Sequence, residues 1–268
     1  MNAATLGAPM QFSGVGLHTG QSATMEVRPA EPGTGIVFVA EGARFSATAE
    51  HAEESALATV IRYNGASVST TEHILSALLA MGVSDAEIAL EGPEIPIMDG
   101  SAKLFVEAIE RAGVVESQRS RPVLTVDAAL ELRNGDRAIV VLPSSEFRVR
   151  VVSDFPAPIG TQYYDAAITP RLYRDDIAGA RTFAFLRDVE AMRAKGLARG
   201  GSLDNALVFD EDGPLQPMQW PNEVVRHKVL DLIGDLCLLG AWPQIEVIAI
   251  KSGHALHTRL TRELRKRG

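Results

Sequence analysis

Apolar side chains dominate residues 223–236, which read EVVRHKVLDLIGDL. No proline interrupts the segment and apolar positions surround it, so it predicts a largely buried helix. Three polar residues, His227, Asp231 and Asp235, stand four residues apart and therefore share one face of that helix. A buried face that carries an imidazole and two carboxylates needs a bound partner or internal hydrogen bonds, because burial removes their hydration.

The same order of patterns occurs twice along the chain. Each half opens with alternating or β-rich runs. An apolar helix, a short strand and a second helical pattern then follow, at 71–82, 86–91 and 98–113 in the first half and at 223–240, 245–250 and 252–268 in the second. We therefore expect an α+β fold made of two similar domains, each a mainly antiparallel sheet packed on helices.

Turn and boundary signals divide this order further. Asn64-Gly65 and Asn134-Gly135 predict β-hairpins. The polar, proline-terminated stretch 114–124 predicts a junction between domains of residues 1–120 and 121–268. Residues 180–210 form an insertion in the second domain that predicts a helix and a strand of its own.

Composition excludes several classes of protein. The 268 residues carry a formal net charge of −8, which disfavours nonspecific binding to nucleic acid. No run of 18 apolar residues occurs, so no membrane span is expected. Cys237 is the single cysteine, which indicates a reducing compartment, and we expect a cytoplasmic protein. The basic terminus TRELRKRG predicts a solvated helix end; peripheral contact with an anionic membrane is the alternative.

Metal binding is one interpretation of the polar residues. His227 and Asp231, four residues apart on a helix, can converge on one ion. Glu72 and His73 stand side by side at the start of the first apolar helix, where a histidine can bind a metal while the glutamate accepts a proton from water. The alternatives are a His–Asp hydrogen-bonded pair and a glutamate favoured by the helix dipole. Thr70 and Thr71 are candidate helix caps.

Two further segments carry candidate chemistry. In KSGHALH, residues 251–257, a strand ends, Ser252-Gly253 turns the chain and His254 opens a helix, where it could protonate a leaving amine. A histidine without a task is the alternative. His257 is expected on the helix surface. The Thr182 hydroxyl in ARTFAF could stabilise an oxyanion, or be unremarkable.

These segments together resemble a known family. GVGLHTG, TTEHILSALLAMG, EGPEIPIMDGSA, ARTFAF, GLARGGSLDNALV, RHKVLDLIGDL and KSGHALH occur in the order found in UDP-3-O-acyl-N-acetylglucosamine deacetylases, zinc enzymes of lipid A biosynthesis. The resemblance covers essentially the whole chain. It implies that the helical layers of the two domains face each other across the active site. It also implies His73, His227 and Asp231 as zinc ligands and Glu72 as the general base.

The other roles come from the same resemblance. It implies that His254, positively charged, stabilises the oxyanion and protonates the leaving amine, with Thr182 as a further oxyanion contact and Asp235 as the residue that orients His254. Lys228 would reach the phosphate-bearing part of the substrate. Further implied substrate contacts are Asp154 and Phe155 near the nucleotide, Phe183, Phe185, Met192 and Gly201 along the acyl chain, and Gly253.

The expected reaction is hydrolysis of the N-acetyl group of UDP-3-O-acyl-N-acetylglucosamine, which releases acetate. We expect one Zn²⁺ per chain, although Fe²⁺ can use the same ligands, and a monomer. A zinc amidohydrolase with a different N-acyl substrate remains an alternative. So does a non-catalytic protein that binds a nucleotide sugar or an acyl chain.

Overall fold

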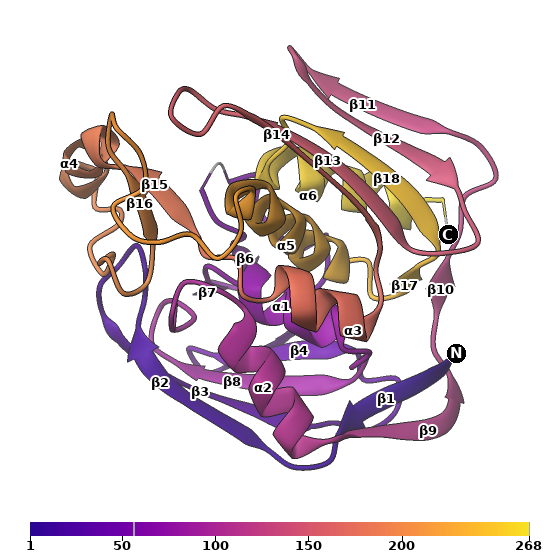
Figure 1. The fold of residues 1–268 in the computed structure, drawn as a ribbon. Coiled ribbons are helices and arrows are strands. Elements are labelled where there is room, and N and C mark those ends of the chain that lie inside the picture. The colour runs from indigo at the N-terminus through magenta and orange to yellow at the C-terminus, as the bar shows by residue number, and fades with distance from the viewer. Residues whose placement is uncertain (56, 268) are drawn as a thin grey trace.

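Two five-stranded sheets enclose the main helices in the computed structural model, which describes residues 1–55 and 57–267 (Figure 1). The first sheet has the order β2 (Met10–Val15), β3 (Ser22–Pro29), β8 (Ala86–Glu91), β4 (Ile36–Ala40) and β5 (Ala43–Ser46). The second has the order β11 (Leu130–Asn134), β12 (Arg137–Pro143), β18 (Ile245–Ile250), β13 (Arg148–Asp154) and β14 (Thr161–Ala167).

The two sheets repeat one topology. In each, the central strand, β8 or β18, pairs antiparallel with one neighbour and parallel with the other. A helix precedes each central strand and a second helix follows it: α1 (Glu72–Ala80) and α2 (Lys103–Ala112) around β8, and α5 (Glu223–Cys237) and α6 (His254–Arg265) around β18. The predicted α+β fold with two similar halves is confirmed, because both halves place the same elements in the same spatial order.

Shorter elements complete the chain. They are β1 (Asn2–Leu6) paired with β9 (Val114–Ser120), β6 (Ile61–Tyr63) with β7 (Ala66–Val68), β10 (Val123–Leu124) with β17 (Trp242–Pro243), β15 (Phe183–Phe185) with β16 (Leu207–Phe209), and the helices α3 (Pro170–Leu172), η1 (Tyr173–Ile177) and α4 (Leu186–Ala194). The predicted insertion thus holds α4 and two strands. The division at residues 120 and 121 stays a prediction.

Turn chemistry follows the sequence closely. Asn64 and Gly65 have φ values of 49° and 90°, as a two-residue hairpin turn requires, and they join β6 to β7. The second hairpin is shifted by one residue from the prediction. Asn134 still pairs with Arg137 in the ladder, so Gly135 and Asp136 form the loop.

Helices α1 and α5 pack against each other at the centre of the molecule (Figure 1). Every residue of α1 is buried, so the helix has no solvent-exposed face. The two helices approach closely at Gly234, where an added Cβ would lie 2.2 Å from the Glu72 carbonyl oxygen. The interface between the halves therefore fixes the start of α1, where Glu72 and His73 lie.

The candidate caps of α1 prove to have other partners. Thr71 occupies the N-cap position but makes no side-chain cap bond; its hydroxyl donates to the Thr59 carbonyl at 3.3 Å. Thr70 has a φ of 58° and donates its hydroxyl to the buried Glu94 carboxylate at 2.7 Å. The prediction that a threonine lies at the cap position is confirmed for Thr71, but neither hydroxyl caps the helix, because both bond to tertiary partners instead.

The chain end forms part of the fold. Arg262 Nε donates to the Ala49 carbonyl at 3.1 Å, and Arg265 Nη1 donates to the Leu239 carbonyl at 2.8 Å. Within the described ranges, no helix combines the length and apolarity needed to cross a membrane. Peripheral membrane contact stays an untested expectation.

Candidate active site

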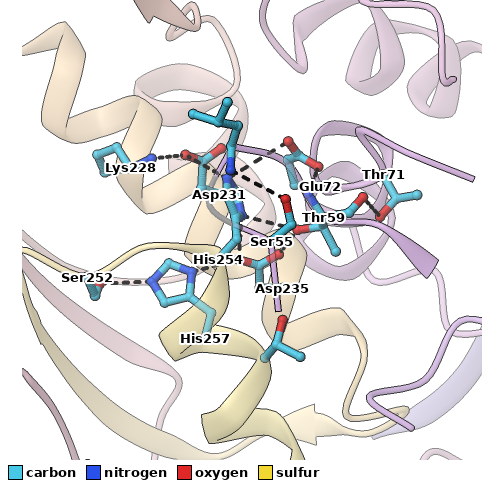
Figure 2. Close-up of polar contacts among 12 residues, drawn as sticks. Ser55, Thr59, Thr71, Glu72, Lys228, Asp231, Asp235, Ser252, His254 and His257 are labelled. Atoms are coloured by element: carbon cyan, nitrogen blue, oxygen red, sulfur yellow. Dashed lines mark hydrogen bonds and ion pairs between the residues drawn. The ribbon is translucent and has the colours of Figure 1, made fainter. Parts of the chain in front are cut away.

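The site lies where α1, α5 and the first turn of α6 meet. Glu72 and His73 begin α1, His227 and Asp231 lie on successive turns of α5, and His254 begins α6. All five side chains are buried and line one cavity of about 270 Å³. Figure 2 shows Glu72, Asp231 and His254 converging from these three helices.

Three side chains form a potential metal site. The ligand atoms of His73, His227 and Asp231 lie within 4.8 Å of one another. His227 Nδ1 donates to the Ala180 carbonyl at 3.0 Å, which leaves Nε2 free and 3.4 Å from Asp231 Oδ1. Two imidazoles and a carboxylate, one imidazole held by a backbone carbonyl, are the donors that a catalytic zinc uses.

Electrostatics keep this trio in its ligating form. Burial lowers the pKa of His73 to about 3 and also lowers the pKa of His227, so both rings are neutral at pH 7. Burial by itself raises the pKa of Asp231, but Lys228 and the surrounding histidines outweigh burial and hold the pKa well below its usual range. Neutral imidazoles and an ionised carboxylate are the states that bind a metal, so the residues fit the ion.

Glu72 and His254 form a pair with opposite pKa shifts. Burial raises the pKa of the Glu72 carboxyl to about 7, although His254 opposes this. Burial lowers the pKa of His254, but Asp235 and the other nearby carboxylates raise it to about 9. Their reactive atoms, Glu72 Oε1 and His254 Nε2, are 4.0 Å apart. A base and an acid with these values can both act near neutral pH.

Asp235 is a buried acceptor for several donors. Its Oδ2 accepts from His254 Nδ1 at 2.8 Å and from His257 Nδ1 at 2.6 Å, while its Oδ1 accepts from the Thr59 hydroxyl. Burial raises the pKa of Asp235, but its two histidine partners outweigh burial and hold the pKa at about 2. The predicted contact between Asp235 and His254 is present.

An apolar cavity adjoins the catalytic cavity on one side. Its volume is about 270 Å³, and it shares Thr182 and Phe183 with the catalytic cavity. The insertion supplies most of its lining, including Met192 and Gly201. Phe185 lines the catalytic cavity and packs on Phe209, so it is not part of the apolar wall.

A polar cavity of about 280 Å³ adjoins on the other side. Its lining includes Asp154, Phe155, Lys228, Lys251 and Gly253, and it shares Phe155 and Lys228 with the catalytic cavity. Lys228 Nζ also donates to Asp231 Oδ2 at 2.5 Å, and Lys251 Nζ lies 2.7 Å from Asp154 Oδ2. The three cavities share lining residues, and we call them together the trough, which has an apolar end and a charged end.

A buried glutamate holds the loop beside this trough. The Glu94 carboxylate accepts from the backbone amides of His18 and Thr19 at 2.9 and 2.8 Å and from the Thr70 hydroxyl. This fixes the glycine-spaced turn GVGLHTG and places His18 in the lining of both the catalytic and the apolar cavity. The sequence marked the turn but gave no reason to place His18 at the site.

Sequence reasoning misplaced one residue and missed another. His257 was expected on the helix surface but is only 1% exposed and contacts Asp235. Its spacing of three residues from His254 put it on the same helix face, a signal that could have revealed it. Thr59 was missed; its amide donates to Glu72 Oε2 at 3.0 Å, and no local pattern around it indicates this contact.

A neutral His/His/Asp trio beside an acid–base pair, set between the halves of a duplicated α+β sandwich, defines a metal-dependent hydrolase. Comparison with known proteins shows which family of metal-dependent hydrolases this chain belongs to. The chain belongs to the UDP-3-O-acyl N-acetylglycosamine deacetylase family, whose family model matches residues 3–266.

Curated relatives are similar in sequence to this chain over nearly its full length. A UDP-3-O-acyl-N-acetylglucosamine deacetylase of Myxococcus xanthus (strain DK1622) is 42% identical over 270 residues, covering 98% of this chain and 86% of the relative. A protein of the same name from Phenylobacterium zucineum (strain HLK1) is 43% identical over 272 residues, covering 98% and 93%.

Proposed function

We propose that this protein hydrolyses the N-acetyl group of UDP-3-O-acyl-N-acetylglucosamine, yielding acetate and the free 2-amino sugar, in lipid A biosynthesis. The observation that carries the proposal is the pairing of buried Glu72 and His254, with opposite pKa shifts, directly beside the metal-binding trio. Family membership supports the same reaction.

The trough agrees with the shape of this substrate. An acyl chain fits the apolar cavity walled by Phe183 and Met192, while the diphosphate and nucleotide fit the polar cavity that holds Lys228 and Lys251. The acetamide would then lie in the catalytic cavity between them, which leads from one end to the other. Asp154, Phe155 and Gly253 are proposed nucleotide contacts.

We propose Zn²⁺, with Fe²⁺ as an alternative, held by His73, His227 and Asp231. When bound, the ion would polarise the acetamide carbonyl and lower the pKa of a water molecule. Ionised Glu72 accepts the proton of the attacking water. Protonated His254 and the Thr182 hydroxyl donate hydrogen bonds to the oxyanion of the tetrahedral intermediate.

Breakdown of that intermediate needs a proton on nitrogen. His254 Nε2 lies on the cavity side of its ring, while Nδ1 is held by Asp235, so Nε2 delivers its proton to the departing amine. The C–N bond breaks, acetate leaves, and the amino sugar takes the proton. A monomer and a cytoplasmic location remain part of this proposal.

Acetate release tests the proposal. Metal-stripped protein is compared with protein given one equivalent of zinc, using UDP-3-O-acyl-N-acetylglucosamine. Glu72→Gln is the matched variant, since it keeps the shape of the side chain and removes the base. We expect zinc-dependent release and a loss of about 10²–10⁴-fold in Glu72→Gln with zinc still bound. Zinc binding without acetate release would overturn the assignment of this substrate. A Glu72→Gln variant that works at the full rate would overturn the role of Glu72 as the base.

A further inference from the structure

A second histidine lies on Asp235, on the side away from the metal site. His257 begins the second turn of α6, one turn beyond His254, and is 1% exposed. Its Nδ1 lies 2.6 Å from Asp235 Oδ2, the same oxygen that His254 Nδ1 contacts at 2.8 Å. Figure 2 shows His257 pointing toward Asp235 on one side and Ser252 on the other.

The protonation state of His257 follows from its neighbours. Burial lowers the pKa of His257, so the ring is neutral near pH 7 and carries one N–H. An ionised Asp235 can only accept, which places that hydrogen on Nδ1. Nε2 is then an acceptor for the Ser252 hydroxyl, 2.8 Å away. One tautomer therefore satisfies both contacts.

Hydrogen bonds restrain both oxygens of the Asp235 carboxylate. The Thr59 hydroxyl holds Oδ1 from the N-terminal half, and His257 holds Oδ2 from α6. Rotation of the carboxylate about its Cβ–Cγ bond would break both contacts at once. Oδ2 is thus fixed at the point where it receives the His254 Nδ1 hydrogen.

The trio Asp235, His254 and His257 also places its potential ligand atoms close together. Direct hydrogen bonds between the carboxylate and both rings already account for this proximity. The arrangement therefore fits a hydrogen-bonded support better than a second metal site.

We propose that His257 is a positioning residue: its Nδ1–H holds the Asp235 carboxylate so that Asp235 keeps the His254 ring aimed into the catalytic cavity. The inference rests on the proposed deacetylase function, because His254 is the acid of that reaction. His257 does not contact the catalytic cavity, so its removal should alter the rate of the chemical step more than substrate binding.

Two amide substitutions separate the contacts of His257. In His257→Asn the side-chain NH₂ lies where Nδ1 was and keeps the bond to Asp235. In His257→Gln the NH₂ lies near the Nε2 position, toward Ser252, and the bond to Asp235 is lost. We expect about tenfold lower kcat with unchanged KM for His257→Gln. His257→Asn should restore kcat to within about threefold of the wild type. Equal losses in both variants would overturn the proposal.

If a variant does not fold, the tautomer of His257 can still be measured in the wild-type protein. Long-range ¹H–¹⁵N spectra of the zinc-loaded wild type report which ring nitrogen of His257 bears the hydrogen. The proposal requires Nδ1–H, and a ring protonated only on Nε2 overturns it. Wild-type protein that releases no acetate would overturn the proposed function instead, and the His257 tautomer would still decide the positioning contact.

Discussion

Replacing Gly234 with alanine tests how closely the site depends on the contact between α1 and α5. Alanine favours a helix over glycine by about 1 kcal/mol, so local propensity alone predicts stabilisation. The structure predicts the opposite. The new Cβ would lie 2.2 Å from the Glu72 carbonyl oxygen and 2.8 Å from the Glu72 Cα, whereas ordinary contact begins near 3.4 Å. The two helices must therefore separate locally by about 1.2 Å.

That displacement acts on stability and on catalysis. Overpacking costs about 1–3 kcal/mol, so after the gain in helix propensity we expect the free energy of unfolding to fall by about 0–2 kcal/mol. Glu72 would move relative to His254 and the metal ligands. A shift of about 1 Å at a reacting group can lower the rate about 10²-fold.

The assay measures kcat for acetate release, zinc content and thermal unfolding of Gly234→Ala beside Gly14→Ala. Gly14 is a matched control, because a Cβ there meets Pro96 Cβ at 3.3 Å and needs a shift of only a few tenths of an ångström. We expect Gly14→Ala to stay within about threefold of the wild-type rate. A Gly234→Ala protein with wild-type kcat would refute the reasoning.

Three further predictions follow from the same geometry. The pH dependence of kcat/KM should be bell-shaped. It rises as Glu72 ionises near its pKa of about 7 and falls as His254 loses its proton near its pKa of about 9. A flat profile from about pH 5 to 10 would contradict the pairing of Glu72 as base with His254 as acid. Elemental analysis should find no bound zinc in Asp231→Ala, whereas Asp235→Ala should keep its zinc and lose about 10²-fold in rate. Full activity in Asp235→Ala would contradict the role of Asp235 in orienting His254. In steady-state kinetics of Lys228→Ala, the factor by which KM rises should be about tenfold larger than the factor by which kcat falls, because a lysine paired with phosphate contributes mainly to binding. An unchanged KM would argue against that contact.

The sequence by itself determined the elements and much of the site. The strands at residues 86–91 and 245–250 agree with the predicted segments, because alternation and helical periodicity are local properties. Repetition of the same order of elements indicated the duplicated fold. Spacing of four residues placed His227 and Asp231 on one face of α5, and the structure adds His73 from the other half.

Only the tertiary structure decided which side chains share the buried space. His257 shares a helix face with His254, but its burial depends on packing against α5, where its partner Asp235 lies. Thr71 could cap its helix locally, yet it bonds to Thr59 instead. The pKa values of Glu72 and His254 likewise depend on burial between two halves of the chain. Desolvation and long-range hydrogen bonds arise only when separate segments pack together, so no local pattern can encode them.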